Sequence, residues 1–208
     1  GGYDHGHNHP YAFGAFATDG DGAVIQYAEC GDRLKKPDEI FNEIMEVCPD
    51  AKRIPIYAGH DCWAKQKDGG PAVYERFRAL GLHMIRAKID LVQGAQQVRF
   101  LLDWKKDAEG KLVKKPKFYI KENCWKTLRQ LPAMIYDESN PEDIMKMNAS
   151  ENDTWSGDDF FEQLRFALAT RFRASIQEPR KADWNTGGWW MEQHKRKEKR
   201  IPGYTTRR

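Results

Sequence analysis

Three groups of acidic residues stand where their carboxylates could act together on a phosphodiester. They are Asp4, Asp61 and a later group made of Asp158, Asp159 and Glu162. Two-metal hydrolysis of a phosphodiester needs several carboxylates that converge on a pair of hard cations about 3.5–4 Å apart. Oxygen ligands suit Mg²⁺ and Mn²⁺. The acids therefore indicate a site for two divalent ions.

The third group leaves open which acid is the main ligand. If a helix begins near Asp158, then Asp159 and Glu162 are three residues apart and project from the same face. Asp158 is then turned by roughly 100° and is better placed as a helix cap or as an outer contact of the site. Taken alone, each acid is more often a cap or a turn residue than a ligand. The metal site is indicated by their combination.

The segments around these acids alternate between strands and helices. An Asp-Gly-Asp-Gly tetrad at residues 19–22 predicts a hairpin turn between two strands rich in aromatic and β-branched residues. Pro132 is expected to kink or end a helix, and residues 107–117 are expected to form an exposed turn. The periodicity of apolar residues predicts a first strand ending at 3–5, further strands at 11–18, 23–29, 54–58, 83–87 and 118–120, and helices at 37–47, 71–80, 90–104, 123–136 and 158–172.

An antiparallel three-stranded start followed by alternating helices and strands is the order of the ribonuclease-H-like fold, an α/β class with a mixed sheet flanked by helices. In that fold the first strand, the end of a central strand and the last helix meet at one edge of the sheet. Asp4, Asp61 and the third acidic group occupy these three places. We therefore expect residues 1–172 to form one nuclease domain and residues 173–208 to form a tail.

The tail differs in composition from the rest of the chain. The formal net charge of the whole chain is +3, whereas residues 171–208 contain 11 Lys and Arg against 4 Asp and Glu. Such a basic segment indicates contact with a polyanion such as nucleic acid, although basic runs are often only solvated ends. Trp184, Trp189 and Trp190 are expected to pack on the body or on a partner.

Four segments resemble the C-terminal nuclease domain of tailed-phage terminase large subunits. Residues 2–6 (GYDHG), followed by Pro10, resemble its G-x-D-x-G…P opening. Residues 81–102 resemble its strand, Lys and Gly-containing helix, and residues 117–136 are similar to its strand, Asn-Cys pair and following helix. Residues 156–168 (SGDDFFEQLRFAL) look like its closing helix.

The chain departs from that pattern at two places. Glu162-Gln163 stands where the family commonly has Asp-Ala, and His60-Asp61 replaces a plainer strand end. The resemblance implies a metal-dependent endonuclease that cuts concatemeric viral double-stranded DNA during genome packaging, with two Mg²⁺ or Mn²⁺ ions and little sequence specificity. It also implies the portal protein and the small terminase subunit as partners, and the host cytoplasm, with transient docking on the procapsid, as location. No GxxxxGK[ST] phosphate loop occurs, which indicates the nuclease half without its ATPase half.

Other residues are also candidates for contacts with phosphate or metal. His60 and Lys88 could contact a phosphate, with a plain hydrogen-bonding histidine and a solvated lysine as the alternatives. His5, His7 and His9 alternate as zinc ligands can, but no Cys or fourth His stands at ligand spacing, which favours a polar loop beside the active site over a zinc site. No apolar run approaches the ~20 residues of a membrane span, so none is expected. Two rival functions stay open: another ribonuclease-H-like nuclease of the resolvase or integrase type, and a non-catalytic module that binds DNA or docks on the motor.

Overall fold

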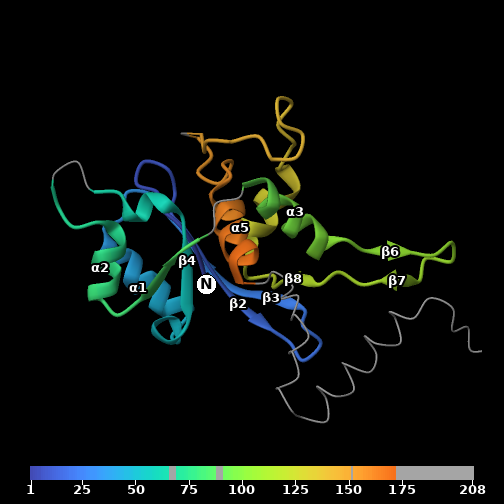
Figure 1. The fold of residues 1–208 in the computed structure, drawn as a ribbon, viewed down its shortest axis with the longest axis horizontal. Helices are drawn as coiled ribbons and strands as arrows, with labels where there is room; N and C mark the ends of the chain where they lie inside the picture. Colours follow the sequence, from blue (N-terminus) through green and yellow to red (C-terminus); the bar gives the residue numbers. More distant parts are fainter. Residues whose placement is uncertain (66–68, 88–90, 151, 172–208) are drawn as a thin grey trace, which may run out of the picture. The chain divides into compact units, whose positions relative to one another are not determined.

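The computed structural model describes residues 1–65, 69–87, 91–150 and 152–171. Six strands form one mixed sheet in the order β5-β4-β1-β2-β3-β8. Strands β1, β2 and β3 pair antiparallel in sequence, whereas β4 pairs parallel with β1, β5 with β4, and β8 with β3 (Figure 1). The strands are β1 (Gly2–Asp4), β2 (Ala12–Thr18), β3 (Val24–Cys30), β4 (Pro55–Ala58), β5 (His83–Arg86) and β8 (Phe118–Ile120).

The predicted turn forms the β2–β3 hairpin for local reasons. The Asp19 side chain accepts hydrogen bonds from the backbone N–H groups of Asp21 and Ala23, at 3.0 and 2.8 Å. Gly22 adopts a φ of +80°, a conformation that costs glycine little and other residues more. Short-range chemistry is therefore enough to fix this part of the topology.

Helices cover both faces of the sheet. Helices α1 (Pro37–Val47) and α2 (Val73–Ala79) lie on one face, and α3 (Leu91–Leu102) and α5 (Asp159–Arg171) lie on the other, as Figure 1 shows. The first face buries a core that includes Tyr3, Ile40 and Phe77. The second buries a cluster of Val24, Val98, Leu101, Phe118, Phe161, Leu164 and Leu168. The sheet is thus the middle of three layers, which confirms the predicted ribonuclease-H-like α/β class.

Helix α5 crosses β1 at very short range. A Cβ atom on Gly2 would lie 2.0 Å from the backbone oxygen of Gln163, so only glycine fits there. Successive side chains of a strand point to opposite faces. Gly2 and Asp4 therefore face α5, while Tyr3 points into the other core. This close approach brings the start of α5 to the end of β1.

The remaining elements differ from the predictions mainly in length. The helix predicted at 123–136 is only α4 (Trp125–Gln130), followed by the 3₁₀ turn η3 (Leu131–Ala133), so Pro132 ends the helix as predicted. The exposed turn at 107–117 belongs to a hairpin of β6 (Lys105–Lys106) and β7 (Leu112–Lys114) that projects from the body in Figure 1. Two more 3₁₀ turns, η1 (Ala51–Arg53) and η2 (His60–Trp63), flank β4. Among the described residues no helix is long and apolar enough to cross a membrane.

Candidate active site

Asp4 ends β1 and is half-buried on the α5 side of the sheet. Its pKa is raised well above the ordinary value, first by burial and then by the negative charges of four other carboxylates: Glu162, Asp61, Asp159 and Asp158. An acid that interacts with four others must lie among them. The structure therefore brings together all five acids that the sequence singles out.

Asp61 reaches this place because β4 runs parallel to β1. Tyr3 is in register with Ala58, so the chain leaves β4 beside the end of β1 and turns into η2. The Asp61 Oδ1 atom accepts the Cys62 N–H at 3.0 Å. A Cβ on Gly59 would lie 2.7 Å from that same oxygen, so glycine leaves room for this carboxylate.

The other three acids stand at the start of α5. The Asp158 backbone oxygen accepts the Glu162 N–H at 2.8 Å, which places Asp158 just before the first turn. Its side chain accepts the Met147 N–H at 3.1 Å, so it ties the preceding loop to the helix. Glu162 is 4% exposed and forms an ion pair with Arg165. Arg165 also pairs with Asp143 at 3.2 Å.

Asp159 is the acid whose carboxylate is left without a complete set of partners. It is 8% exposed, and its Oδ2 atom accepts no hydrogen bond from the described residues. Burial raises the pKa of Asp159 to about 7, and the charge of Asp158 adds to this, while its own amide and Arg33 act in the opposite direction. A buried acceptor without a donor is costly unless a ligand satisfies it.

The five acids are neighbours rather than a closed ligand cage. Within the described ranges, no three His, Cys, Asp or Glu side chains lie close enough together to hold a metal ion as they stand. Side-chain rotation is therefore needed before the carboxylates share an ion. Glu162, in particular, has its carboxylate turned to Arg165.

Three basic residues that the sequence alone does not assign to the site lie near the acids. They are Arg33, Arg165 and His5. Arg33 lowers the pKa of Asp159 and donates to the Ser150 carbonyl at 2.8 Å. Arg165 stands three residues after Glu162, a helical spacing that predicts an ion pair. His5 accepts or donates a hydrogen bond with the Tyr3 hydroxyl at 3.1 Å. Burial lowers the pKa of His5, and the charge of Asp61 partly offsets this.

Two predicted contributors have less structural support. His60 is exposed at the first position of η2, next to Asp61. Lys88 lies outside the described residues, as do residues 173–208 with their three tryptophans. Their roles stay predictions.

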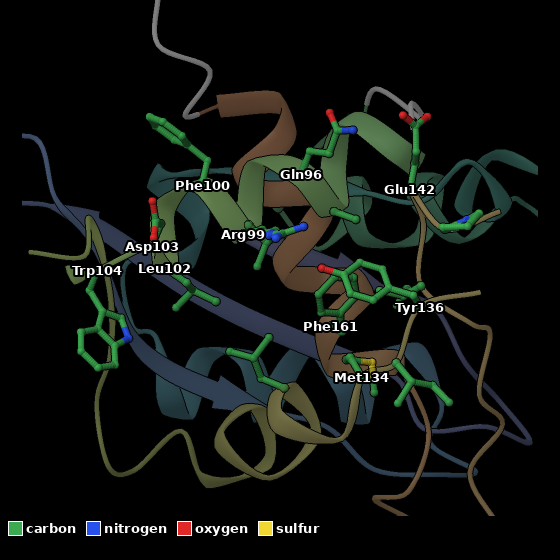
Figure 2. A pocket seen from close by; sticks show the side chains of 16 residues that line it. Gln96, Arg99, Phe100, Leu102, Asp103, Trp104, Met134, Tyr136, Glu142 and Phe161 are labelled. Atoms are coloured by element: carbon green, nitrogen blue, oxygen red, sulfur yellow. The ribbon is translucent and has the colours of Figure 1, made fainter. Parts of the chain in front are cut away.

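The domain also has a hollow that lies apart from the acids. It measures about 840 Å³ and lies between α3 and residues 131–144, with apolar walls that include Phe100, Trp104, Met134 and Tyr136 (Figure 2). The Arg99 guanidinium lies 5.9 Å from the Tyr136 ring. None of the five acids lines this hollow. The hollow and the acidic cluster are therefore separate features.

A mixed sheet with an antiparallel three-stranded start, helices on both faces and acids at one edge defines a domain of the ribonuclease-H-like class. The nuclease domain of the phage P22 large terminase has a similar structure, with a TM-score of 0.58 and 20% identity over 79% of this chain and 76% of that one. The large terminase of a thermophilic bacteriophage is similar with a TM-score of 0.56 and 16% identity. That match covers 80% of this chain but 37% of the thermophilic phage protein.

A third solved structure is less similar. The large terminase nuclease from thermophilic phage G20c, with bound magnesium, gives a TM-score of 0.49 and 14% identity over 81% of this chain and 78% of that one. No family model matches the chain, and no curated protein matches it either. The fold of the chain is that of large-terminase nuclease domains, which confirms the resemblance at the level of structure.

Proposed function

We propose that this chain is a metal-dependent endonuclease that cuts viral double-stranded DNA during genome packaging. The observation that supports it most is that Asp61 and Asp159, from two other elements, lie close enough to Asp4 for their charges to raise its pKa. Similarity to terminase nuclease domains supports a nuclease role in packaging. The fold alone does not define the function, because one fold can serve many chemistries.

The residues present fit a pair of divalent cations. The raised pKa values of Asp4 and Asp159 mark a concentration of negative charge that a cation would relieve, and the buried Asp159 Oδ2 lacks a donor. Asp4, Asp61 and Asp159 would hold Mg²⁺ or Mn²⁺, with Glu162 as a further ligand once its carboxylate turns from Arg165. Two such ions supply an activated water and charge stabilisation for the leaving 3′ oxygen.

The protein side chains around the acids would bind and orient the phosphate. Burial raises the pKa of Tyr3 well above its ordinary value, so its hydroxyl keeps its proton and shares a hydrogen bond with Nδ1 of His5. In the tautomer in which Nδ1 accepts this bond, Nε2 carries the proton and can donate a hydrogen bond to a phosphate oxygen. His60 and Lys88 are candidates for further phosphate contacts, with a plain hydrogen-bonding histidine and a solvated lysine as the alternatives. Phosphate contacts carry no base information, so we expect little sequence preference.

The setting of the reaction follows from the same proposal. We expect the portal protein and the small terminase subunit to be partners, and the host cytoplasm, at the procapsid, to be the location. An ATPase half would belong to the same packaging protein.

Incubation of plasmid DNA with Mn²⁺, and then with EDTA, tests the proposal. Supercoiled and linear duplexes should both be cut with Mn²⁺ and left intact with EDTA. The control is Glu46→Gln, which removes an exposed carboxylate from α1, far from the site in the sequence, and should cut like wild type. Cleavage confined to four-way junctions would favour a resolvase, and binding without cleavage would favour the non-catalytic module.

A further inference from the structure

Lys126, in the first turn of α4, is held among aromatic rings at the entrance to α5. Its Nζ atom lies 4.5 Å from the centre of the Trp155 ring and 5.6 Å from the centres of the Phe160 and Trp125 rings. It also donates a hydrogen bond to the Gly31 carbonyl at 2.9 Å. A cation over aromatic faces is attracted by the ring quadrupoles. Lys126 therefore connects the end of β3 to the residues that lead into α5.

A second side chain of α4 acts on the same segment. Gln130 stands four residues after Lys126, which places both on one face of the helix. Its Oε1 atom accepts the Phe160 N–H at 2.8 Å, and its Nε2 atom donates to the Trp155 carbonyl at 3.4 Å. Phe160 is fully buried and immediately follows Asp159. Lys126 thus contacts the ring of Phe160, and Gln130 binds the backbone of Phe160.

Helix α4 is itself fixed to the sheet. The Glu29 carboxylate accepts the Lys126 and Thr127 N–H groups at 2.6 and 3.1 Å, and the Thr127 hydroxyl at 2.7 Å. These N–H groups are among those that a helix leaves unpaired at its start. A continuous set of contacts therefore runs from β3 through α4 to the first residues of α5.

Asp159 depends on this support more than its neighbours do. The Asp158 side chain is bound to Met147, and the Glu162 side chain is bound to Arg165. The Asp159 Oδ2 atom has no hydrogen-bond partner among the described residues. Its place is therefore set mainly by the backbone that Asp159 shares with Phe160.

We propose that Lys126 is a positioning residue for the metal ligand Asp159. It acts through Phe160 and Trp155, with Gln130 as the second point of attachment. The inference rests on the proposed function, because Asp159 is a ligand only if the site binds divalent ions. Residues that orient a ligand typically change metal affinity or activity by roughly 10- to 100-fold.

Two substitutions separate the charge of Lys126 from its bulk. Lys126→Met keeps an unbranched side chain without the cation, and Lys126→Arg keeps a cation that stacks on aromatic rings. We expect Lys126→Met to weaken the binding of Mn²⁺ alone, measured by calorimetry, by about tenfold or more, and Lys126→Arg to stay near wild type. The Mn²⁺ concentration for half-maximal hydrolysis of bis(p-nitrophenyl) phosphate should rise in parallel, with kcat at saturating Mn²⁺ little changed.

Lys52→Met is the matched control, because the Lys52 Nζ atom lies 5.1 Å from the Phe41 ring on another part of the domain. It removes a cation from an aromatic ring without touching α4, so Mn²⁺ affinity should not change. If Lys126→Met fails to fold, Gln130→Met replaces it, since it removes the acceptor of the Phe160 N–H and should weaken Mn²⁺ binding in the same direction.

The results distinguish this inference from the function on which it rests. Wild type that binds Mn²⁺, together with a folded Lys126→Met variant of unchanged Mn²⁺ affinity, overturns the positioning role and leaves the proposed function standing. Equal weakening in the Met and Arg variants overturns the role of the charge. Wild type that neither binds Mn²⁺ nor hydrolyses the diester overturns the proposed function and this inference with it.

Discussion

Asp159→Asn should abolish cleavage and yet make the metal-free protein more stable. The structure gives the reason, because burial and then the charge of Asp158 raise the pKa of Asp159 to about 7. The ionised carboxylate is therefore unfavourable in the folded protein. Asn has nearly the same shape without the charge. The substitution should therefore raise the free energy of unfolding of the metal-free protein while it removes a metal ligand.

The gain in the free energy of unfolding of Asp159→Asn over the wild type depends on pH. Between the ordinary value of 3.8 and about 7, the folded protein binds more protons at Asp159 than the unfolded chain does. The free energy of unfolding of the wild type therefore falls as pH rises through this window. The difference between these two pKa values of Asp159 corresponds to roughly 4 kcal/mol in the free energy of unfolding. This is an upper limit because the surroundings can relax. At about 2–4 °C per kcal/mol, this limit corresponds to a rise in Tm of at most roughly 8–16 °C for Asp159→Asn at pH 8, and hardly any rise is expected at pH 4.

Thermal unfolding with EDTA at pH 4 and pH 8 measures this directly. The control is Glu46→Gln, an exposed position on α1 where loss of the charge should leave Tm nearly unchanged at both pH values. An equal loss of Tm at both pH values for Asp159→Asn would refute the reasoning. So would an unchanged Tm at pH 8, since it would mean that the carboxylate is not in a crowded, buried cluster.

Three further predictions follow from the site and the tail. Asp61→Asn should leave the fold intact and abolish plasmid cutting, so a folded variant that cuts near the wild-type rate would remove Asp61 from the site. Glu162→Ala should slow cutting and raise the Mn²⁺ requirement, whereas Asp158→Ala should mainly lower the free energy of unfolding in urea by about 1 kcal/mol, because the Met147 N–H loses its acceptor. Stronger inactivation by Asp158→Ala than by Glu162→Ala would reverse their roles. Deletion of residues 181–208 should flatten the salt dependence of DNA binding by about one unit per lost phosphate contact, and an unchanged slope would show that the tail does not contact DNA.

The parts of the fold that could be predicted from the sequence depend on local chemistry. The β2–β3 hairpin is specified by Asp19 and Gly22, and the end of α4 by Pro132, within a few residues of where they act. The start of α4 could not be predicted in the same way. Its N–H groups are satisfied by Glu29, a residue almost 100 positions earlier in the chain. Only the completed sheet brings that carboxylate to the helix.

In the candidate site, too, features with a local signal could be predicted from the sequence, and contacts between distant segments could not. The order of elements predicts that the ends of two strands and the start of the last helix meet. On that basis the sequence could place Asp4, Asp61 and the acids at 158–162 in one site. The Glu162 ion pair with Arg165 also has a local signal, the three-residue helical spacing. Arg33 has no such signal, since its effect on Asp159 arises from packing between segments far apart in the sequence.

The central claim is that Asp4, Asp61 and Asp159 share divalent ions. Anomalous scattering from crystals grown with Mn²⁺ tests it most directly, because it locates the ions without assuming an activity. We predict Mn²⁺ within about 2.1 Å of carboxylate oxygens of all three residues. Mn²⁺ bound instead at His5, His7 and His9, or at Asp158 with Asp159 left without an ion, would contradict the account.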